Sequence, residues 1–275
     1  MRLWRLERGE IAERLEGPGI LACGDRAEAL ASVMDGRTAD RVVLCGMAGA
    51  REGLREAPYV PCPVSVSQWR ARMTEALGCP GLSVWIAAGL SCRDASGRPD
   101  VMRGEETQVF GAMSLDPGLA NGTHVVLLPG THSKWVWLDD GLIVRFRTCM
   151  TGELFALLGQ SSLLAAGARG ANEDQGFAAG LARASEGAAP SAALFEARAA
   201  QLVDGRTVDW ARGFVSGLLI GAEIAAINPQ EPVLAIGDPA LVARYGAALA
   251  RCGVQMRAMD GEACAIAGLR LLDDD

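Results

Sequence analysis

Short apolar runs that end in glycine clusters dominate the first part of the chain. Val42–Cys45 and Val84–Ala88 are continuous apolar runs of strand length, and Ser67–Leu77 between them has helical spacing. A buried strand, a crossover and another buried strand predict a mostly parallel α/β sheet. Because ligands of such sheets bind beyond the carboxyl ends of the strands, we expect Gly46–Arg51 and Gly89–Arg93 to lie near a binding site.

The same patterning continues on both sides of this region. A hairpin is predicted around Arg8-Gly9-Glu10, between Leu3–Glu7 and Ile11–Leu15. The second half begins near Thr123. The remaining elements that periodicity predicts are helices over Asp25–Met34, Glu105–Met113, Leu154–Leu158, Asp209–Ile227 and Pro239–Cys252, strands over Val125–Leu128, Lys134–Leu138, Leu142–Phe146 and Val233–Ile236, and a last strand and helix. Asp140-Gly141 is typical of a tight hairpin turn. Gly167–Pro190 is a polar segment rich in glycine and alanine.

Three glycines recur at four-residue spacing in the predicted helix Asp209–Ile227. A glycine inside a helix costs about 1 kcal/mol relative to alanine, so Gly213, Gly217 and Gly221 need a physical reason. We expect close packing against another backbone, with direct ligand contact as the alternative.

Composition and charge limit the class of protein. The 275 residues carry a net charge of -7 and are 50% hydrophobic, which suits two compact domains facing a cleft. An acidic chain of this kind is not a general nucleic-acid binder, because phosphate contacts need a basic face. No apolar run is judged long enough to span a bilayer, and Met1–Arg8 lacks the apolar segment of a secretion signal. These features predict a soluble cytoplasmic protein without a membrane partner.

The cysteines and histidines add little chemistry. The eight cysteines have no paired metal-ligand spacing and are expected to be reduced, mostly small core residues. Two histidines, His124 and His132, exclude a multi-histidine metal site.

The strand–turn–strand unit around Pro129-Gly130-Thr131 is the most informative segment. Such a turn can direct backbone N–H groups at a phosphate, with Thr131 and Ser133 as hydroxyl donors and Lys134 as a point charge. The alternative is an ordinary hairpin with a basic residue on its solvent face. His132 could contact phosphate or substrate, although a lone histidine beside a turn more often makes a structural hydrogen bond.

Several motifs together resemble one family. They are Gly46-Met47-Ala48-Gly49 with Ala57-Pro58-Tyr59, Val101–Gln108, Pro129–Trp135, Met150–Leu154 and Ser216–Glu223. In order and spacing they are similar to the 2-dehydro-3-deoxygalactonokinases, sugar-acid kinases with the two-domain actin/hexokinase-like α/β fold. The resemblance implies ATP-dependent phosphorylation of the terminal (6-) hydroxyl of 2-dehydro-3-deoxy-D-galactonate, with Mg²⁺, in galactonate breakdown. It also implies a sugar-acid domain over residues 1–120 and a nucleotide domain over residues 121–275.

The resemblance further implies roles for particular residues. Those expected at the nucleotide phosphates or adenosine are Gly130, Thr131, His132, Ser133, Lys134, Gly152 and Gly237. Those expected at the sugar acid are Gly46, Met47 and Arg103, whose guanidinium suits a carboxylate. Glu105 or Glu106 would act as general base or as a water-mediated metal ligand. Alternatively, both glutamates complement the start of their helix and Arg103 pairs with them.

Thr151 has a second interpretation, because Thr151-Gly152-Glu153 fits a helix-capping sequence. The working hypothesis places the Gly130 turn and Arg103 in one hollow between two lobes. Metal ligands cannot be named from the sequence, and a homo-oligomer is possible.

Departures from the family pattern keep other functions open. Relatives begin with a strand ending in an Asp-Trp-Gly-Thr/Ser type motif, the first-domain phosphate loop, before a segment resembling Met1–Trp4. We therefore expect the natural protein to extend upstream, with a first domain that is incomplete at its N-terminus here and little activity for these 275 residues alone. Ala50 and Leu54 stand where the family usually has serine and tryptophan. The alternatives are a non-catalytic sugar-acid or nucleotide-binding relic and a kinase for a related sugar acid or an amino sugar.

Overall fold

The chain divides into two compact units. The computed structural model describes residues 1–275 except residues 8–9, 23, 38, 77–81, 161–166 and 274–275. Unit 1 comprises Met1–Thr123, Val136–Phe146 and Met259–Asp275, and unit 2 comprises His124–Trp135 and Arg147–Ala258. The chain therefore passes from one unit to the other inside strands and not through a linker.

Unit 1 begins with an antiparallel hairpin of strands β1 (Arg2–Glu7) and β2 (Glu10–Glu16), as predicted, although its Arg8-Gly9 turn lies outside the described residues. Its remaining strands form two three-stranded sheets of order β3-β6-β5 and β4-β7-β8. These strands are β3 (Val42–Leu44), β4 (Tyr59–Pro61), β5 (Thr74–Glu75), β6 (Val84–Ile86), β7 (Gly89–Arg93) and β8 (Pro99–Met102). The helices are η1 (Ile20–Ala22), α1 (Arg26–Met34), η2 (Gly46–Gly49), α2 (Val66–Arg70), α3 (Glu105–Leu115), η3 (Pro117–Ala120) and α10 (Gly261–Asp273).

Two sequence predictions in unit 1 need correction. The helix predicted over Ser67–Leu77 ends at Arg70, because Thr74 and Glu75 pair antiparallel with Ile86 and Trp85 of β6. Sheet pairing thus overrides the helical spacing beyond α2. The mostly parallel sheet is also only partly present: β3 pairs with β6 and β4 with β7 in parallel, but β8 joins β7 antiparallel.

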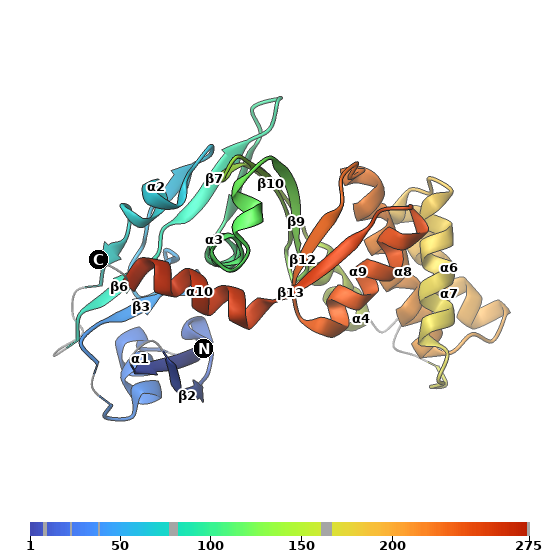
Figure 1. Cartoon of the computed structure of the whole chain (residues 1–275). Helices are drawn as coiled ribbons and strands as arrows, with labels where there is room; N and C mark the ends of the chain where they lie inside the picture. Colours follow the sequence, from blue (N-terminus) through green and yellow to red (C-terminus); the bar gives the residue numbers. More distant parts are fainter. Residues whose placement is uncertain (8–9, 23, 38, 77–81, 161–166, 274–275) are drawn as a thin grey trace. The chain divides into compact units, whose positions relative to one another are not determined.

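Helices α3 and α10 of unit 1 pack backbone against backbone (Figure 1). A Cβ on Gly111 would lie 1.9 Å from the carbonyl oxygen of Cys264, and one on Gly268 would lie 1.9 Å from that of Thr107. The two glycines therefore fix how closely the start of α3 approaches α10.

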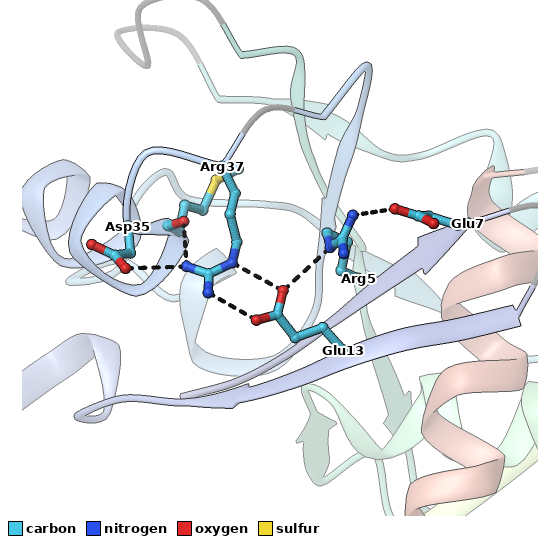
Figure 2. A network of polar contacts seen from close by, with 6 residues as sticks. Arg5, Glu7, Glu13, Asp35 and Arg37 are labelled. Atoms are coloured by element: carbon cyan, nitrogen blue, oxygen red, sulfur yellow. Dashed lines mark hydrogen bonds and ion pairs between the residues drawn. The ribbon is translucent and has the colours of Figure 1, made fainter.

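The β1–β2 hairpin is connected to the end of α1 by a charged network (Figure 2). Both carboxylate oxygens of Glu13 accept hydrogen bonds from Arg37, and one also accepts a bond from Arg5. Arg37 reaches Asp35, and Arg5 reaches Glu7. Hydrogen bonding from Arg37 is the largest of the effects that lower the pKa of Glu13 below its ordinary value.

A five-stranded sheet has the strand order β11-β10-β9-β12-β13 and contains the hairpins that β9, β10 and β11 form. Its strands are β9 (Thr123–Leu128), β10 (Ser133–Asp139), β11 (Leu142–Cys149), β12 (Val233–Gly237) and β13 (Met256–Asp260). All five agree with predicted strands. The turn between β10 and β11 has φ 43° at Asp140 and 77° at Gly141, the left-handed conformation expected of an Asp-Gly hairpin.

Helix α8 (Val208–Ile227) contacts the four other helices described in unit 2 (Figure 1). These are α4 (Thr151–Gln160), α6 (Glu173–Ser185), α7 (Pro190–Val203) and α9 (Pro239–Arg251). Sequence reasoning missed both α6, which lies in the segment described only as polar and rich in glycine and alanine, and α7, which lies where no element was predicted.

The predicted backbone packing is confirmed for Gly213 and Gly217, whereas a Cβ on Gly221 would meet the Ala184 side chain at 2.6 Å. A Cβ on Gly213 would lie 1.9 Å from the carbonyl oxygen of Glu173, and one on Gly217 would lie 2.1 Å from that of Phe177. Gly176 and Gly180 of α6 face α8 in the same way. Glycine on both helices allows the α6 and α8 backbones to touch.

The expectation that no apolar run is long enough to span a bilayer needs correction at helix α8. By length and composition it is apolar enough to cross a membrane, but 67% of its apolar window is buried inside the protein, as in the core helix of a folded domain. The described cysteines are free, as predicted, but only Cys92 and Cys264 are buried and Cys252 is exposed.

Candidate functional site

The turn between β9 and β10 lies where two parallel strands end side by side. Val125, Val126 and Leu127 of β9 pair in parallel with Val233, Leu234 and Ala235 of β12. The segments that follow both strands therefore meet at one edge of the sheet. A Cβ on Gly237 would contact Pro129 Cδ at 3.5 Å, which places Gly237 against the start of the turn.

The first turn of α4 packs directly on this β9–β10 turn. The Glu153 N–H donates to the carbonyl oxygen of Thr131 at 2.9 Å. Gly152 permits the contact, because a Cβ there would lie 2.2 Å from the Gly130 carbonyl oxygen. His132 pairs with the Glu153 carboxylate across the same contact, so its described partner is structural.

The residues after the turn are buried. Lys134 is 4% exposed and its Nζ donates to the His132 carbonyl oxygen at 3.2 Å. The alternative of an ordinary hairpin with its lysine on the solvent face is therefore wrong. The Ser133 hydroxyl lies 2.9 Å from the Tyr245 hydroxyl and 3.3 Å from a Glu223 carboxylate oxygen, so it is directed into the core.

A cavity of about 240 Å³ opens beside the turn within unit 2. One wall is polar backbone at Gly130 and Gly152, and another is apolar. The residues that line it are Gly130, Thr151, Gly152, Phe155, Glu173, Arg212, Ser216, Leu219, Ile220, Leu241, Arg244 and Tyr245. An apolar pocket with a few convergent polar groups is the usual form of a small-molecule site.

Two arginines at this cavity are held by neighbouring groups. Arg244 pairs with Glu173 at 2.7 Å and lies over the Phe177 ring. Arg212 lies over the Phe155 ring, with 5.1 Å between its guanidinium carbon and the ring centroid. Sequence reasoning did not select them, since neither belongs to a glycine turn.

Glu223 joins the β9–β10 turn to three helices. It is 5% exposed, and its carboxylate accepts hydrogen bonds from the Ser133, Thr151 and Tyr245 hydroxyls and from Trp135 Nε1. Burial raises the pKa of Glu223, and the hydrogen bonds oppose that shift. Thr151 is the first residue of α4, and its hydroxyl donates to Glu223; the interpretation of Thr151 as a helix cap is therefore wrong.

The candidate sugar-acid residues form a separate cluster in unit 1. Arg103 lies over the Tyr59 ring, with 4.2 Å between its guanidinium carbon and the ring centroid. Its Nη2 donates to the Ala57 carbonyl oxygen at 2.7 Å and its Nε to the Tyr59 hydroxyl at 3.3 Å. Nη1 is buried beside Gly49 and has no hydrogen-bond partner among the described residues.

The two glutamates accept hydrogen bonds from backbone at the start of α3. Glu105 accepts the Arg103 N–H at 3.1 Å, and both Glu106 oxygens accept the Gly104 N–H, at 2.9 and 2.7 Å. Gly104, with φ 111°, packs on Gly46, where a Cβ on Gly104 would lie 3.1 Å from the Gly46 Cα. The strands and α3 thus bring Gly46, Arg103 and both carboxylates together.

The two carboxylates differ in burial, and their chemical properties differ as a result. Glu106 is fully buried, which raises its pKa to about 8. Glu105 is half-buried, so it retains surface that another molecule can touch. Met47, from the Gly46 turn, is 48% exposed. A carboxyl with a pKa near neutrality suits proton transfer, whereas an accessible one suits direct contact with a hydroxyl.

No group of three or more His, Cys, Asp or Glu side chains that could hold a metal ion occurs among the residues described by the structure. Among the described residues, neither cluster therefore contains a set of side chains that could enclose a metal ion. Mg²⁺ bound mainly through phosphate oxygens and water needs only one or two carboxylates.

The fold is of the α/β class, and comparison with known proteins identifies the family. The model of the 2-keto-3-deoxy-galactonokinase family matches residues 1–272. The chain belongs to this family.

Three relatives show how far the similarity extends. The chain is 36% identical to a probable 2-dehydro-3-deoxygalactonokinase of Rhizobium meliloti (strain 1021), covering 98% of this chain and 91% of that protein. It is 37% identical to the 2-dehydro-3-deoxygalactonokinase of Escherichia coli (strain K12), covering 83% and 77%. A crystal structure from Sinorhizobium meliloti, described as a candidate 2-dehydro-3-deoxygalactonokinase, is 33% identical with a TM-score of 0.85, covering 98% of this chain and 94% of that one. The predicted family is thereby confirmed, and the chain shares the α/β fold of the solved relative.

Proposed function

We propose that this protein phosphorylates the terminal (6-) hydroxyl of 2-dehydro-3-deoxy-D-galactonate, with ATP as donor, in D-galactonate breakdown. Membership of the family supports the reaction class. The observation that carries the proposal is the β9–β10 turn, packed on the first turn of α4 and open to the cavity of unit 2. Phosphoryl transfer depends chiefly on positioning and on charge stabilisation, which such a turn supplies.

Unit 2 binds the nucleotide in this proposal. The backbone N–H groups between Gly130 and Lys134 and the Gly152 end of α4 contact the phosphates, with the positive end of the helix dipole beside them. Thr131 and His132, exposed in the turn, are available to the same phosphates. Ser133 supports the turn from below, because its hydroxyl is directed at Glu223 and Tyr245. Gly237 allows close approach of the adenosine.

Unit 1 binds the sugar acid. Arg103 contacts the carboxylate, because a guanidinium can hold a carboxylate through two parallel hydrogen bonds. Gly46 and Met47 line the acceptor. Glu105, as the accessible carboxylate, is the stronger candidate for direct contact with the acceptor hydroxyl, and Glu106 is the alternative with a pKa of about 8.

Magnesium enters as the counter-ion of ATP. The carboxylates described do not form a cage, so no step is assigned to a protein-bound metal. A cytoplasmic location and the absence of nucleic-acid and membrane partners follow from the acidic composition and the metabolic role. We also propose that the protein forms a homo-oligomer.

A coupled ADP assay on the purified protein tests the function. We expect ATP-dependent turnover with 2-dehydro-3-deoxygalactonate, and much weaker turnover with sugar acids of other stereochemistry and with amino sugars. Mass spectrometry of the product should show one added phosphoryl group on the terminal hydroxyl. Nucleotide binding by calorimetry without turnover of any sugar acid would instead identify a non-catalytic relic.

A further inference from the structure

Glu223 is buried beneath the β9–β10 turn and bonded to residues from three other elements. Trp135 Nε1 donates to one carboxylate oxygen at 2.7 Å, and Tyr245 OH donates to the other at 2.8 Å. Ser133 and Thr151 donate to the same oxygen as Tyr245. Three hydroxyls thus converge on one carboxylate oxygen of Glu223, and one indole N–H contacts the other oxygen.

Such a group is costly to bury and is not needed to fill space. Removing a carboxylate from water costs several kcal/mol, which an apolar side chain in the same place would avoid. Apart from Ser216, the other buried residues of α8 are glycine, aliphatic or aromatic. Stability of α8 therefore does not explain why a glutamate occupies position 223.

The four donors show what the carboxylate fixes. Ser133 and Trp135 follow the turn directly, and Thr151 begins the helix that packs on the turn. Tyr245 and Thr151 also line the cavity beside it. Glu223 thus sets the position of the turn against α4 from below, while the backbone contact between Glu153 and Thr131 sets it from the side.

We propose that Glu223 is a positioning residue for the phosphates of the nucleotide: it holds the β9–β10 turn and the first residue of α4 in one fixed arrangement without contacting the ligand. This inference rests on the proposed function, because it assigns the phosphates to the turn. Displacement of about 1 Å in such an arrangement can lower a rate about a hundredfold.

Glu223→Gln is the informative substitution because it keeps the size of the side chain. Its amide oxygen can still accept from Trp135, but its NH₂ group then faces the hydroxyls of Thr151 and Tyr245 and removes their acceptor. We expect kcat/KM for ATP to fall about 10-fold or more, with the KM for the sugar acid within about twofold of wild type. The affinity for ADP, measured by calorimetry, should fall as well.

Two control variants separate positioning from stability. Glu196→Gln removes the partner of Arg183 at the surface of unit 2 and should leave both kinetic constants unchanged. Leu218→Ala removes a fully buried side chain from α8 and should lower Tm without a selective loss toward ATP. An ATP-selective defect in Glu223→Gln, at a Tm no lower than that of Leu218→Ala, supports the proposal.

The outcomes also separate this inference from the proposed function. Unchanged kcat/KM for ATP and unchanged ADP affinity in folded Glu223→Gln would overturn the positioning role. An equal fall in kcat/KM for both substrates, in proportion to the fall in Tm, would show that Glu223 acts only through stability. That result would also overturn the positioning role. Failure of the wild-type protein to phosphorylate the sugar acid would contradict the proposed function alone, since ADP calorimetry still measures the effect of Glu223.

Discussion

Arg103 is held as a rigid donor by contacts on both sides. The Tyr59 ring supports one face of the guanidinium, and Ala57 and the Tyr59 hydroxyl occupy two of its three nitrogens. A planar fork held in this way matches a carboxylate, whereas the ammonium of lysine carries the same charge without that geometry.

Arg103→Lys should therefore raise the KM for the sugar acid while the KM for ATP stays near wild type. A lost charge-assisted hydrogen bond is worth about 1.5–3 kcal/mol, which corresponds to an increase of about 10- to 100-fold. Steady-state kinetics with each substrate varied in turn measures the change. Arg93→Lys, at the exposed end of β7, is the matched control. Equal KM values in both variants would remove Arg103 from the acid-binding role.

Glu106 should make stability depend on pH. Burial raises its pKa to about 8 from the ordinary value of 4.5, so between these values the folded protein retains a proton that the unfolded chain releases. The stabilising contribution is fully present below the unfolded pKa and is lost as pH rises through the folded pKa. The slope is at most about 1.4 kcal/mol per pH unit.

Urea denaturation of the wild type and of Glu106→Gln across this pH window measures that contribution. The free energy of unfolding of the wild type should fall more steeply with rising pH than that of the variant, because glutamine has no proton to release. Glu196→Gln, at the surface, should retain the wild-type slope. Parallel curves for wild type and Glu106→Gln would show that Glu106 does not titrate with a raised pKa.

Residue types were easier to predict than their partners. The lysine after the turn was selected from the strand–turn–strand pattern, and the carboxylates at the start of α3 were selected with the family resemblance. Their burial was not predictable, because it depends on Gly46, Gly111 and other residues distant in sequence. Glu223 belongs to a quoted motif, but a single glutamate in an apolar helix gives no signal of four donors from other elements.

At the scale of elements, the glycines of α6 and α8 set how closely two helices of unit 2 approach. Gly217→Ala places a Cβ 2.1 Å from the Phe177 carbonyl oxygen, so the helices must separate. We expect a loss of about 1–3 kcal/mol in the free energy of unfolding, as for overpacked cores.

Gly159→Ala provides the matched control, because a Cβ there would meet no atom of the described residues within 4 Å. Replacing an exposed helical glycine with alanine should stabilise α4 by up to about 1 kcal/mol. If close packing explains the glycines of α8, chemical denaturation should show a lower free energy of unfolding for Gly217→Ala and a higher one for Gly159→Ala. A neutral Gly217→Ala would show that the helices tolerate separation.

Long periodic elements were predictable and short ones were not. Helix α8 and the three strands after Thr123 have clear apolar periods, and the structure reproduces them. The helix predicted beyond Arg70 failed because pairing of Thr74–Glu75 with β6 is a long-range contact without local signal. Helices α6 and α7 were missed because alanine and glycine, although they pack tightly here, contribute little to hydrophobic periodicity.

At the scale of the whole molecule, the proposed function divides the two ligands between the two units. The turn, Gly152 and Gly237 belong to unit 2, whereas Arg103 and the Gly46 turn belong to unit 1. A nucleotide added alone should therefore protect one set of backbone amides, and the sugar acid alone should protect the other.

Hydrogen exchange measured by mass spectrometry tests this division without turnover. ADP alone should slow exchange in peptides covering Leu128–Lys134 and the start of α4, because ligand binding stabilises the state in which those amides are bonded. The sugar acid alone should slow exchange over Gly46–Gly49 and Arg103–Glu106. Peptides from α7, which contributes no residue to either cluster, serve as the internal control. Protection of the Arg103 region by ADP alone, with none at the turn, would reverse the assignment of the ligands, and with it the role proposed for Glu223.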